Sequence, residues 1–176
     1  ARQALNLPER YILFVGSIEE RKNLALIVEA LAQLQDKDIH LVAVGRKTPY
    51  VNTVVDSARR LGVLSRLHLM HGVGSAMLPG IYAGAKVFVY PSRFEGFGIP
   101  LIEALNAGVP VIGATGSCLE EAGGPSSLYT DPSDATMLAS MIDRVLIDIS
   151  LRQKMITDGR EYVERFTPKR LARDLS

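Results

Sequence analysis

Short apolar segments that end at a glycine recur along this 176-residue chain, and segments with helical spacing of apolar residues separate them. Tyr11–Val15 is the first and is followed by Gly16, and Ile39–Val44 is the second and is followed by Gly45. Continuous apolar runs rich in β-branched and aromatic residues are typical of strands buried on both faces of a parallel sheet. This alternation restricts the chain to an α/β fold.

The pattern predicts a Rossmann-like doubly wound parallel sheet of about six strands flanked by helices. The predicted strands are Tyr11–Val15, Ile39–Val44, Leu67–Met70, Val87–Tyr90, Val109–Ala114 and Leu128–Tyr129. The predicted helices are Leu24–Leu34, Val51–Leu61, a short segment capped by Ser75, Ile99–Ala107, one turn at Leu119–Ala122, a helix opened by Asp131–Asp134, and a charged segment Leu151–Leu175 interrupted at Thr167–Pro168.

The composition narrows the class of protein. A net charge of +1 provides no bulk field for nucleic acid or an anionic membrane surface. The one cysteine excludes an intrachain disulfide and a four-cysteine zinc site, and it suits a reducing compartment such as the cytoplasm. No apolar run approaches the roughly 20 residues that span a bilayer, so no transmembrane segment is predicted.

Ligands of doubly wound sheets bind beyond the carboxyl ends of the strands. This rule places five loops on one edge of the predicted sheet: Gly16–Lys22, Gly45–Lys47, His71–Gly74, Pro91–Gly98 and Thr115–Glu121. The chemistry of the protein is therefore expected along that edge.

The first of these loops carries two adjacent cations, Arg21 and Lys22, at a predicted helix start. Positive charge there opposes the helix dipole unless an anion is bound, so a phosphate site is one interpretation. The alternative is a solvated loop in which Glu19 and Glu20 balance the two cations. The loop lacks the G-x-x-x-x-G-K-[ST] pattern of a Walker A motif.

The stretch Tyr90–Glu103 runs from a strand through a glycine-rich bend into a helix, and it carries two carboxylates, Glu95 and Glu103. Glycines before a helix allow close backbone approach to a diphosphate, but G-F-G-I-P-L lacks the third glycine of a dinucleotide fingerprint. The carboxylates can hold hydroxyls, such as a ribose diol, or stabilise developing positive charge. The alternative is that both are ordinary surface charges.

No metal site is predicted. The three histidines lack metal-ligand spacing. Asp36-Lys37-Asp38 has the D-x-D form of metal-dependent sugar transferases, but it precedes a strand and is interpreted as a solvated turn. Cys118 has no identifiable base beside it and is interpreted as incidental.

Three segments together resemble one family. A-K-V-F-V-Y-P-S-R-F-E-G-F-G-I-P-L-I-E-A-L-N-A-G-V-P-V-I resembles the donor-binding domain of retaining glycosyltransferases of family 4, which have the GT-B fold. Glu95 and Glu103 match the family's E-x7-E signature. V-G-S-I-E-E-R-K-N looks like its V-G-T-x-E-P-R-K-N loop, and S-C-L-E-E-A-G-G-P-S-S-L-Y-T-D-P resembles its later S-x-L-P-E loop, with departures at Ser17, Glu20 and Glu120.

The resemblance implies a role for each matching residue. Arg21 and Lys22 would neutralise the diphosphate of a nucleotide-sugar donor, Glu95 would contact the transferred sugar, and Glu103 would hold the ribose hydroxyls. The catalytic set is then Glu95, Arg21 and Lys22. The implied donor-binding set is Gly16, Ser17, Arg46, His71, Gly72, Val73, Gly96, Phe97, Gly98, Ile99, Pro100 and Glu103.

The resemblance also implies the domain organisation. Residues 1–10 would be a residual linker from a missing N-terminal acceptor domain, and residues 11–176 would be the donor-binding domain. The expected reaction is transfer of a hexose, mannose or a related sugar, from a UDP- or GDP-sugar to a glycan or lipid-linked acceptor in polysaccharide synthesis, with retention and without a cofactor. The whole protein would be cytoplasmic and could associate peripherally with the inner face of a membrane, and this chain alone would be inactive. The alternatives are another GT-B enzyme, such as an epimerase or phosphorylase, and a non-catalytic nucleotide-sugar-binding module.

Overall fold

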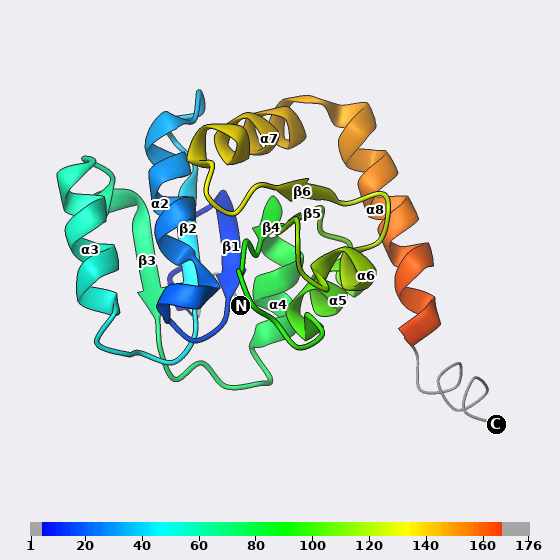
Figure 1. Ribbon diagram of the computed structural model, residues 1–176, viewed down its shortest axis with the longest axis horizontal. Helices are drawn as coiled ribbons and strands as arrows, with labels where there is room; N and C mark the ends of the chain where they lie inside the picture. Colours follow the sequence, from blue (N-terminus) through cyan, green and yellow to red (C-terminus); the bar gives the residue numbers. More distant parts are fainter. Residues whose placement is uncertain (1–4, 167–176) are drawn as a thin grey trace.

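A six-stranded parallel sheet forms the centre of the computed structural model, which describes residues 5–166 (Figure 1). The strand order is β3-β2-β1-β4-β5-β6, and every neighbouring pair is parallel. The strands are β1 (Tyr11–Val15), β2 (His40–Val44), β3 (Leu67–Met70), β4 (Val87–Val89), β5 (Val111–Ala114) and β6 (Leu128–Thr130). Because the order reverses between β1 and β4, the loops that follow these two strands lie next to each other.

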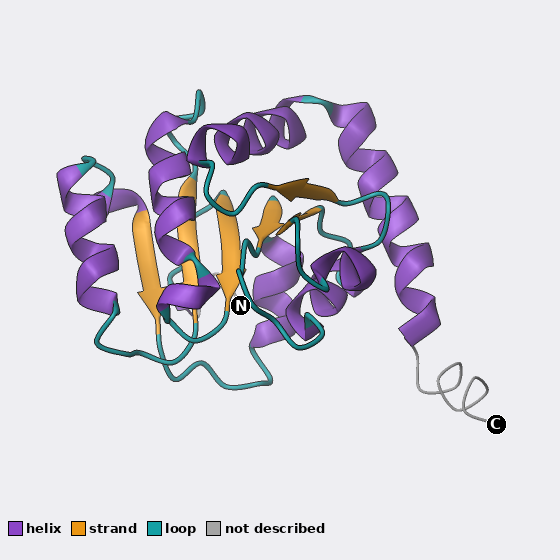
Figure 2. Ribbon diagram, viewed as in Figure 1, coloured by secondary structure: helices purple, strands orange, loops and turns teal. Residues whose placement is uncertain are grey.

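The helices form two groups on the two faces of the sheet (Figure 2). In one group α2 (Leu24–Gln33) packs against α3 (Val51–Arg60) and α7 (Ala135–Ile147). In the other, α5 (Ile99–Asn106) packs against α4 (Leu78–Gly84), α6 (Leu119–Gly123) and α8 (Ile149–Val163). Three short 3-10 turns are η1 (Glu20–Lys22), η2 (Leu64–Arg66) and η3 (Glu164–Phe166).

Four aromatic side chains inside the core form a row beneath the carboxyl edge of the sheet, and we call them the aromatic row. Phe14 stacks on Tyr90 with ring centroids 5.6 Å apart, and Tyr90 stacks on Phe88 at 5.9 Å. Phe88 then contacts Tyr82 of α4 at 5.5 Å. All four are at most 2% exposed, so the row is a fixed floor under the loops above it.

The predicted doubly wound α/β fold is confirmed, and its deviations are local. The helix predicted after Ser75 begins later, at Leu78, and Ser75 does not cap it. Pro79 occupies its first turn, where a missing N–H costs no hydrogen bond, so the proline starts the helix and does not break it. The helix predicted from Leu151 begins earlier, because the side chain of Asp148 accepts a hydrogen bond from the Leu151 amide.

The predicted interruption at Thr167–Pro168 and the helical segment after it lie outside the described residues. Within residues 5–166, no helix combines the length and the apolar character needed to cross a membrane.

Candidate functional site

The loops after β1 and β4 are joined directly at the carboxyl edge of the sheet. The Arg93 amide donates to the Arg21 carbonyl at 2.8 Å, and the Arg21 guanidinium donates back to the Phe94 carbonyl at 2.9 Å. These bonds hold side by side two segments that are more than seventy positions apart in the sequence.

A charged cluster sits where the two loops meet, and we call Lys22, Tyr90, Ser92 and Glu95 the Lys22–Glu95 cluster. The Lys22 ammonium donates to both Glu95 carboxylate oxygens, at 3.1 and 3.2 Å, and to the Tyr90 hydroxyl at 2.9 Å. The Ser92 hydroxyl donates to Glu95 Oε2 at 3.1 Å. Only 11% of the Lys22 side chain and 13% of the Glu95 side chain are exposed. The several hydrogen bonds offset the cost of removing both charges from water.

Tyr90 links this cluster to the aromatic row. Burial, and then the nearby Glu95 carboxylate, raise the pKa of the Tyr90 hydroxyl, so the hydroxyl stays protonated. Its oxygen accepts the hydrogen bond from the Lys22 ammonium. The Lys22 ammonium also lies 5.5 Å from the centre of the Tyr90 ring, within reach of a cation–π interaction.

Asn23 explains why Arg21 and Lys22 lie in the turn η1 and not inside α2. Its backbone is left-handed, with φ of 68°, which separates the turn from the helix. Its side-chain amide donates to the carbonyls of Pro91 at 3.0 Å and Pro132 at 2.8 Å. The sequence predicts Arg21 and Lys22 at the helix start, whereas the structure places them before it, with Lys22 turned towards Glu95.

The start of α5 presents backbone donors beside this cluster. Gly98 has φ of +89°, and a Cβ there would approach Leu119 Cδ2 to 3.0 Å, so the position requires glycine. Pro100 has no N–H, and the Leu101 amide bonds the Gly98 carbonyl at 3.0 Å. The amides of Gly98 and Ile99 are therefore the donors that this helix start can offer to an anion.

Glu103 lies one turn further along α5 and is exposed. It borders a cavity of about 430 Å³ in the groove between α4 and α5. The lining residues are Ser75, Leu78, Pro79, Tyr82, Ala83, Glu103, Asn106 and Ala107. Glu95 does not line this cavity, although both carboxylates follow β4.

The loops after β2 and β3 enclose a further space at the same edge. A cavity of about 560 Å³ brings together four predicted donor-binding residues, Arg46, His71, Gly72 and Val73. The His71 ring lies with Nδ1 2.8 Å from the Gly45 carbonyl, which joins the two loops. At Gly45 a Cβ would lie 1.7 Å from the Gly16 carbonyl oxygen, so only glycine permits this approach of the β1 and β2 loops.

The remaining predicted residues flank this edge. The Ser17 hydroxyl hydrogen-bonds the Glu19 carboxylate, and this bond lowers the pKa of Glu19. Gly96 follows Glu95 in the bend, and Phe97 packs edge-on against Phe166 of η3 with ring centroids 5.4 Å apart.

Four side chains of the site were not assigned to it from the sequence: Asn23, Tyr90, Ser92 and Cys118. Cys118, interpreted as incidental, contacts the bend, with its thiol 3.0 Å from the carbonyls of Glu95 and Gly96. Ser92 and Tyr90 adjoin the E-x7-E stretch, and this proximity was the available signal.

The D-x-D segment lies at the opposite edge and forms the predicted turn. Asp36 forms an ion pair with Arg10 at 2.6 Å and accepts hydrogen bonds from the backbone amides of Asp38 and Ile39. The Arg10 hydrogen bond lowers the pKa of Asp36. Among residues 5–166, no group of three histidine, cysteine or carboxylate side chains gathers as a metal site would require.

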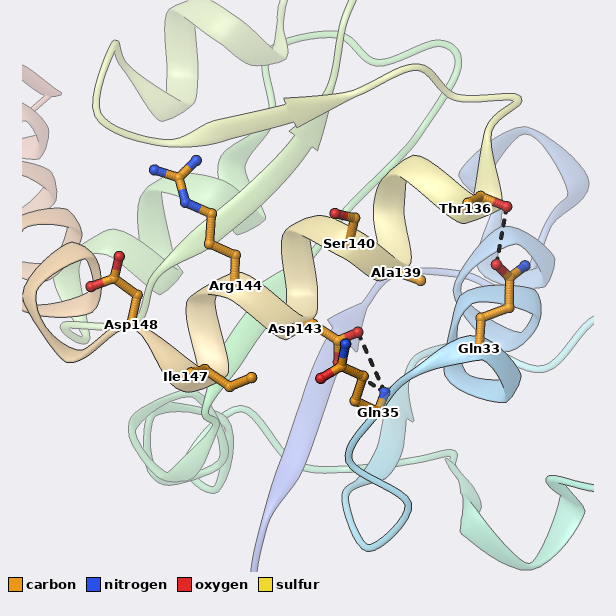
Figure 3. Close-up of a pocket in the computed structure, with 9 residues that line it drawn as sticks. All are labelled: Gln33, Gln35, Thr136, Ala139, Ser140, Asp143, Arg144, Ile147 and Asp148. Atoms are coloured by element: carbon orange, nitrogen blue, oxygen red, sulfur yellow. Dashed lines mark hydrogen bonds between the residues drawn. The ribbon is translucent and has the colours of Figure 1, made fainter.

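A further cavity of about 440 Å³ lies between the carboxyl end of α2 and the length of α7 (Figure 3). Two hydrogen bonds cross it. The Thr136 hydroxyl donates to the Gln33 side-chain oxygen at 3.0 Å, and the Gln35 backbone amide donates to the Asp143 carboxylate at 3.1 Å. None of the predicted site residues lines it. These contacts join the carboxyl end of α2 to α7, away from the site.

Known proteins are similar to this chain in both sequence and fold. Residues 1–162 match the family model described as glycosyl transferases group 1. The chain belongs to this family. The O-antigen chain mannosyltransferase B of Escherichia coli is 31% identical over 163 residues, which cover 89% of this chain and 42% of that protein.

Two solved structures extend the likeness. Sucrose-phosphate synthase from Thermosynechococcus elongatus is 29% identical with a TM-score of 0.82, over 99% of this chain and 48% of that one. HepE from Anabaena, solved with UDP and glucose, is 21% identical with a TM-score of 0.88, over 99% of this chain and 50% of that one. The chain therefore spans about half the length of these relatives.

Proposed function

We propose that this chain is the nucleotide-sugar donor-binding half of a retaining glycosyltransferase of family 4. The observation that carries the proposal is the joining of the Lys22–Glu95 cluster to the start of α5 at one edge of the sheet. Cations, backbone amides and an oriented carboxylate there meet the needs of a departing diphosphate and of a sugar that develops positive charge.

Arg21 and Lys22 have different exposures, and we assign them different tasks. The Arg21 side chain is 47% exposed and lies 3.8 Å from Glu95, so it is accessible to a bound diphosphate. Lys22 is almost buried and holds both Glu95 oxygens. Arg21 would neutralise the diphosphate as negative charge develops on it, while Lys22 sets the orientation of Glu95 and adds positive charge behind it.

Glu95 would act on the transferred sugar and Glu103 on the ribose of the same donor. The Glu95 carboxylate is oriented by Lys22 and Ser92, which suits electrostatic stabilisation of an oxocarbenium-like sugar and positioning of its hydroxyls. Glu103 borders the cavity between α4 and α5 and would accept the ribose hydroxyls. The base would enter the space lined by Arg46 and His71.

The donor is a UDP- or GDP-linked hexose, and the similarity to a mannosyltransferase of O-antigen synthesis favours mannose. Residues 1–10 would link this domain to an N-terminal acceptor-binding domain, because the chain spans 42% of that relative. The acceptor would be a glycan or lipid-linked glycan, and the whole protein would work in the cytoplasm or at the inner face of the membrane.

Calorimetric titration of this chain with UDP, GDP and their hexose conjugates tests the proposal. Binding of one nucleotide series is expected, and an Arg21→Ala/Lys22→Ala variant should bind it more weakly. Unchanged affinity in that variant would contradict the diphosphate assignment. Analysis of the anomeric product of the full-length protein then tests retention and separates transfer from epimerase or phosphorylase chemistry.

A further inference from the structure

The Tyr82 hydroxyl is buried without a hydrogen-bond partner. Tyr82 belongs to α4, is 2% exposed, and is the one residue among 5–166 with a fully buried side-chain polar atom that lacks such a bond. Leaving a buried hydroxyl unsatisfied is destabilising, because the group loses its hydrogen bonds to water and gains none in the protein. Phenylalanine would fill the same space without that cost, so the hydroxyl needs a reason other than packing.

Glu103 is a charged group that can explain it. Both residues line the cavity between α4 and α5, and Glu103 is the one carboxylate in that lining. Burial, and then the Glu103 carboxylate, raise the pKa of the Tyr82 hydroxyl. No hydrogen bond joins the two groups in the structure.

Tyr82 is the rigid member of this pair. Its ring packs on Phe88 at the end of the aromatic row. Its helix is anchored from β1, where the Tyr11 hydroxyl donates to the Ile81 carbonyl at 2.7 Å. Glu103 is exposed, so its carboxylate is the group free to rotate towards Tyr82. Fixing such a long charged side chain costs side-chain entropy, which a hydrogen bond from a fixed donor offsets.

We propose that Tyr82 is a positioning residue for Glu103: its hydroxyl donates to one carboxylate oxygen and leaves the other aimed at the ribose hydroxyls of the donor. This inference rests on the proposed function, because the ribose is the ligand assigned there to Glu103. Tyr82 itself touches no reacting atom, and it acts through the orientation of Glu103.

The first test is a double-mutant cycle on nucleotide affinity. Calorimetric titration with the nucleoside diphosphate gives the dissociation constants of the chain, of Tyr82→Phe, of Glu103→Gln and of the double variant. Because Tyr82 acts through Glu103, Tyr82→Phe should weaken binding several-fold in the unaltered chain and should have little further effect in Glu103→Gln. Additive effects would overturn the proposed contact.

The second test measures recognition of the ribose. The chain is titrated with the nucleoside diphosphate that it binds and with the 2′-deoxy form of that nucleotide. The unaltered chain should prefer the ribose form by about tenfold, and Tyr82→Phe should reduce that ratio to about twofold. Affinity for inorganic pyrophosphate should not change, because the diphosphate contacts lie elsewhere.

Tyr90→Phe is the matched control. It removes a buried hydroxyl from the same aromatic row, but one that serves Lys22 and not Glu103. It should leave the preference for ribose over deoxyribose unchanged. An equal loss of that preference in both variants would indicate a general effect of the row and would overturn the specific role of Tyr82.

Failure of this inference is distinguishable from failure of the proposed function. If nucleoside diphosphates bind and Tyr82→Phe keeps the full ribose preference, Tyr82 does not position Glu103, while the proposed function stands. If the unaltered chain binds neither UDP nor GDP, the proposed function fails and the ribose-positioning role fails with it.

Discussion

Glu95 and Glu103 are eight positions apart in one stretch of sequence, yet the structure treats them in opposite ways. Glu95 is 13% exposed and is held by Lys22 and Ser92 before any ligand arrives. Glu103 is exposed on α5 and lines the same cavity as Tyr82. The difference teaches that folding alone orients one carboxylate, whereas we propose that the other takes its final orientation on binding. Rigidity is thus concentrated where the reaction is proposed to occur.

Glu95→Gln removes the charge of the carboxylate that folding orients, and it should have the largest effect. In the full-length protein, transfer should slow by about 100- to 1,000-fold, because an oriented charge next to the developing positive charge is lost. The measurement is the steady-state transfer rate with saturating donor. A variant that keeps full transfer activity would remove Glu95 from the reaction.

Lys22→Met tests whether folding depends on the same pair. The substitution leaves the Glu95 carboxylate nearly buried without its cation, so the free energy of unfolding should fall by about 2–3 kcal/mol. Urea unfolding followed by circular dichroism measures the loss. The matched Lys22→Met/Glu95→Gln variant should recover part of it, since no charge is then stranded. An unchanged urea midpoint for Lys22→Met would show that the pair contributes nothing to stability.

Glu103→Gln should affect binding without affecting folding. Nucleoside diphosphate should bind about tenfold more weakly, because hydrogen bonds from the ribose to a carboxylate are lost. The free energy of unfolding should change by less than about 0.5 kcal/mol, as expected for an exposed side chain. Calorimetry and urea unfolding of the same preparation provide both values. A large loss of stability would mean that Glu103, like Glu95, is part of the folded framework.

His68→Gln sharpens the comparison by isolating a pH effect far from both carboxylates. Burial, and then the neighbouring His40, lower the pKa of His68 on β3. The His40 Nδ1 atom lies 2.7 Å from the His68 Nε2 atom. The unfolded chain therefore holds more protons on this residue, so the free energy of unfolding should fall as the pH drops below about 6.5. His68→Gln should flatten the dependence of the melting temperature on pH between about 5 and 7. An equally steep dependence in the variant would assign it to other groups.

The fold could be predicted because its determinants are local and repeated. Each apolar run predicted as a strand became one, and the carboxyl-edge rule placed the loops that carry Arg21, Glu95 and His71 on one edge. The partners of individual side chains could not be predicted, because they depend on which loops meet. Nothing near Lys22 in the sequence indicates that its partner is Glu95, more than seventy positions away.

Backbone conformation also limited the prediction of the site. The left-handed backbone of Asn23 moved Lys22 out of the predicted helix start and towards Glu95. The unsatisfied hydroxyl of Tyr82 is a property of burial, so a sequence pattern that marks Tyr82 as a core residue contains no sign of it.

The two hydrogen bonds of the Asn23 side chain have a consequence for the order of folding. One amide connects the turn before α2 to Pro91 after β4 and to Pro132 after β6, across 68 and 109 positions. Contacts over such separations form only after the intervening chain has lost most of its freedom. A nascent chain that has not yet completed β6 cannot make both bonds. The site is therefore expected to assemble last, after the sheet that supports it is complete.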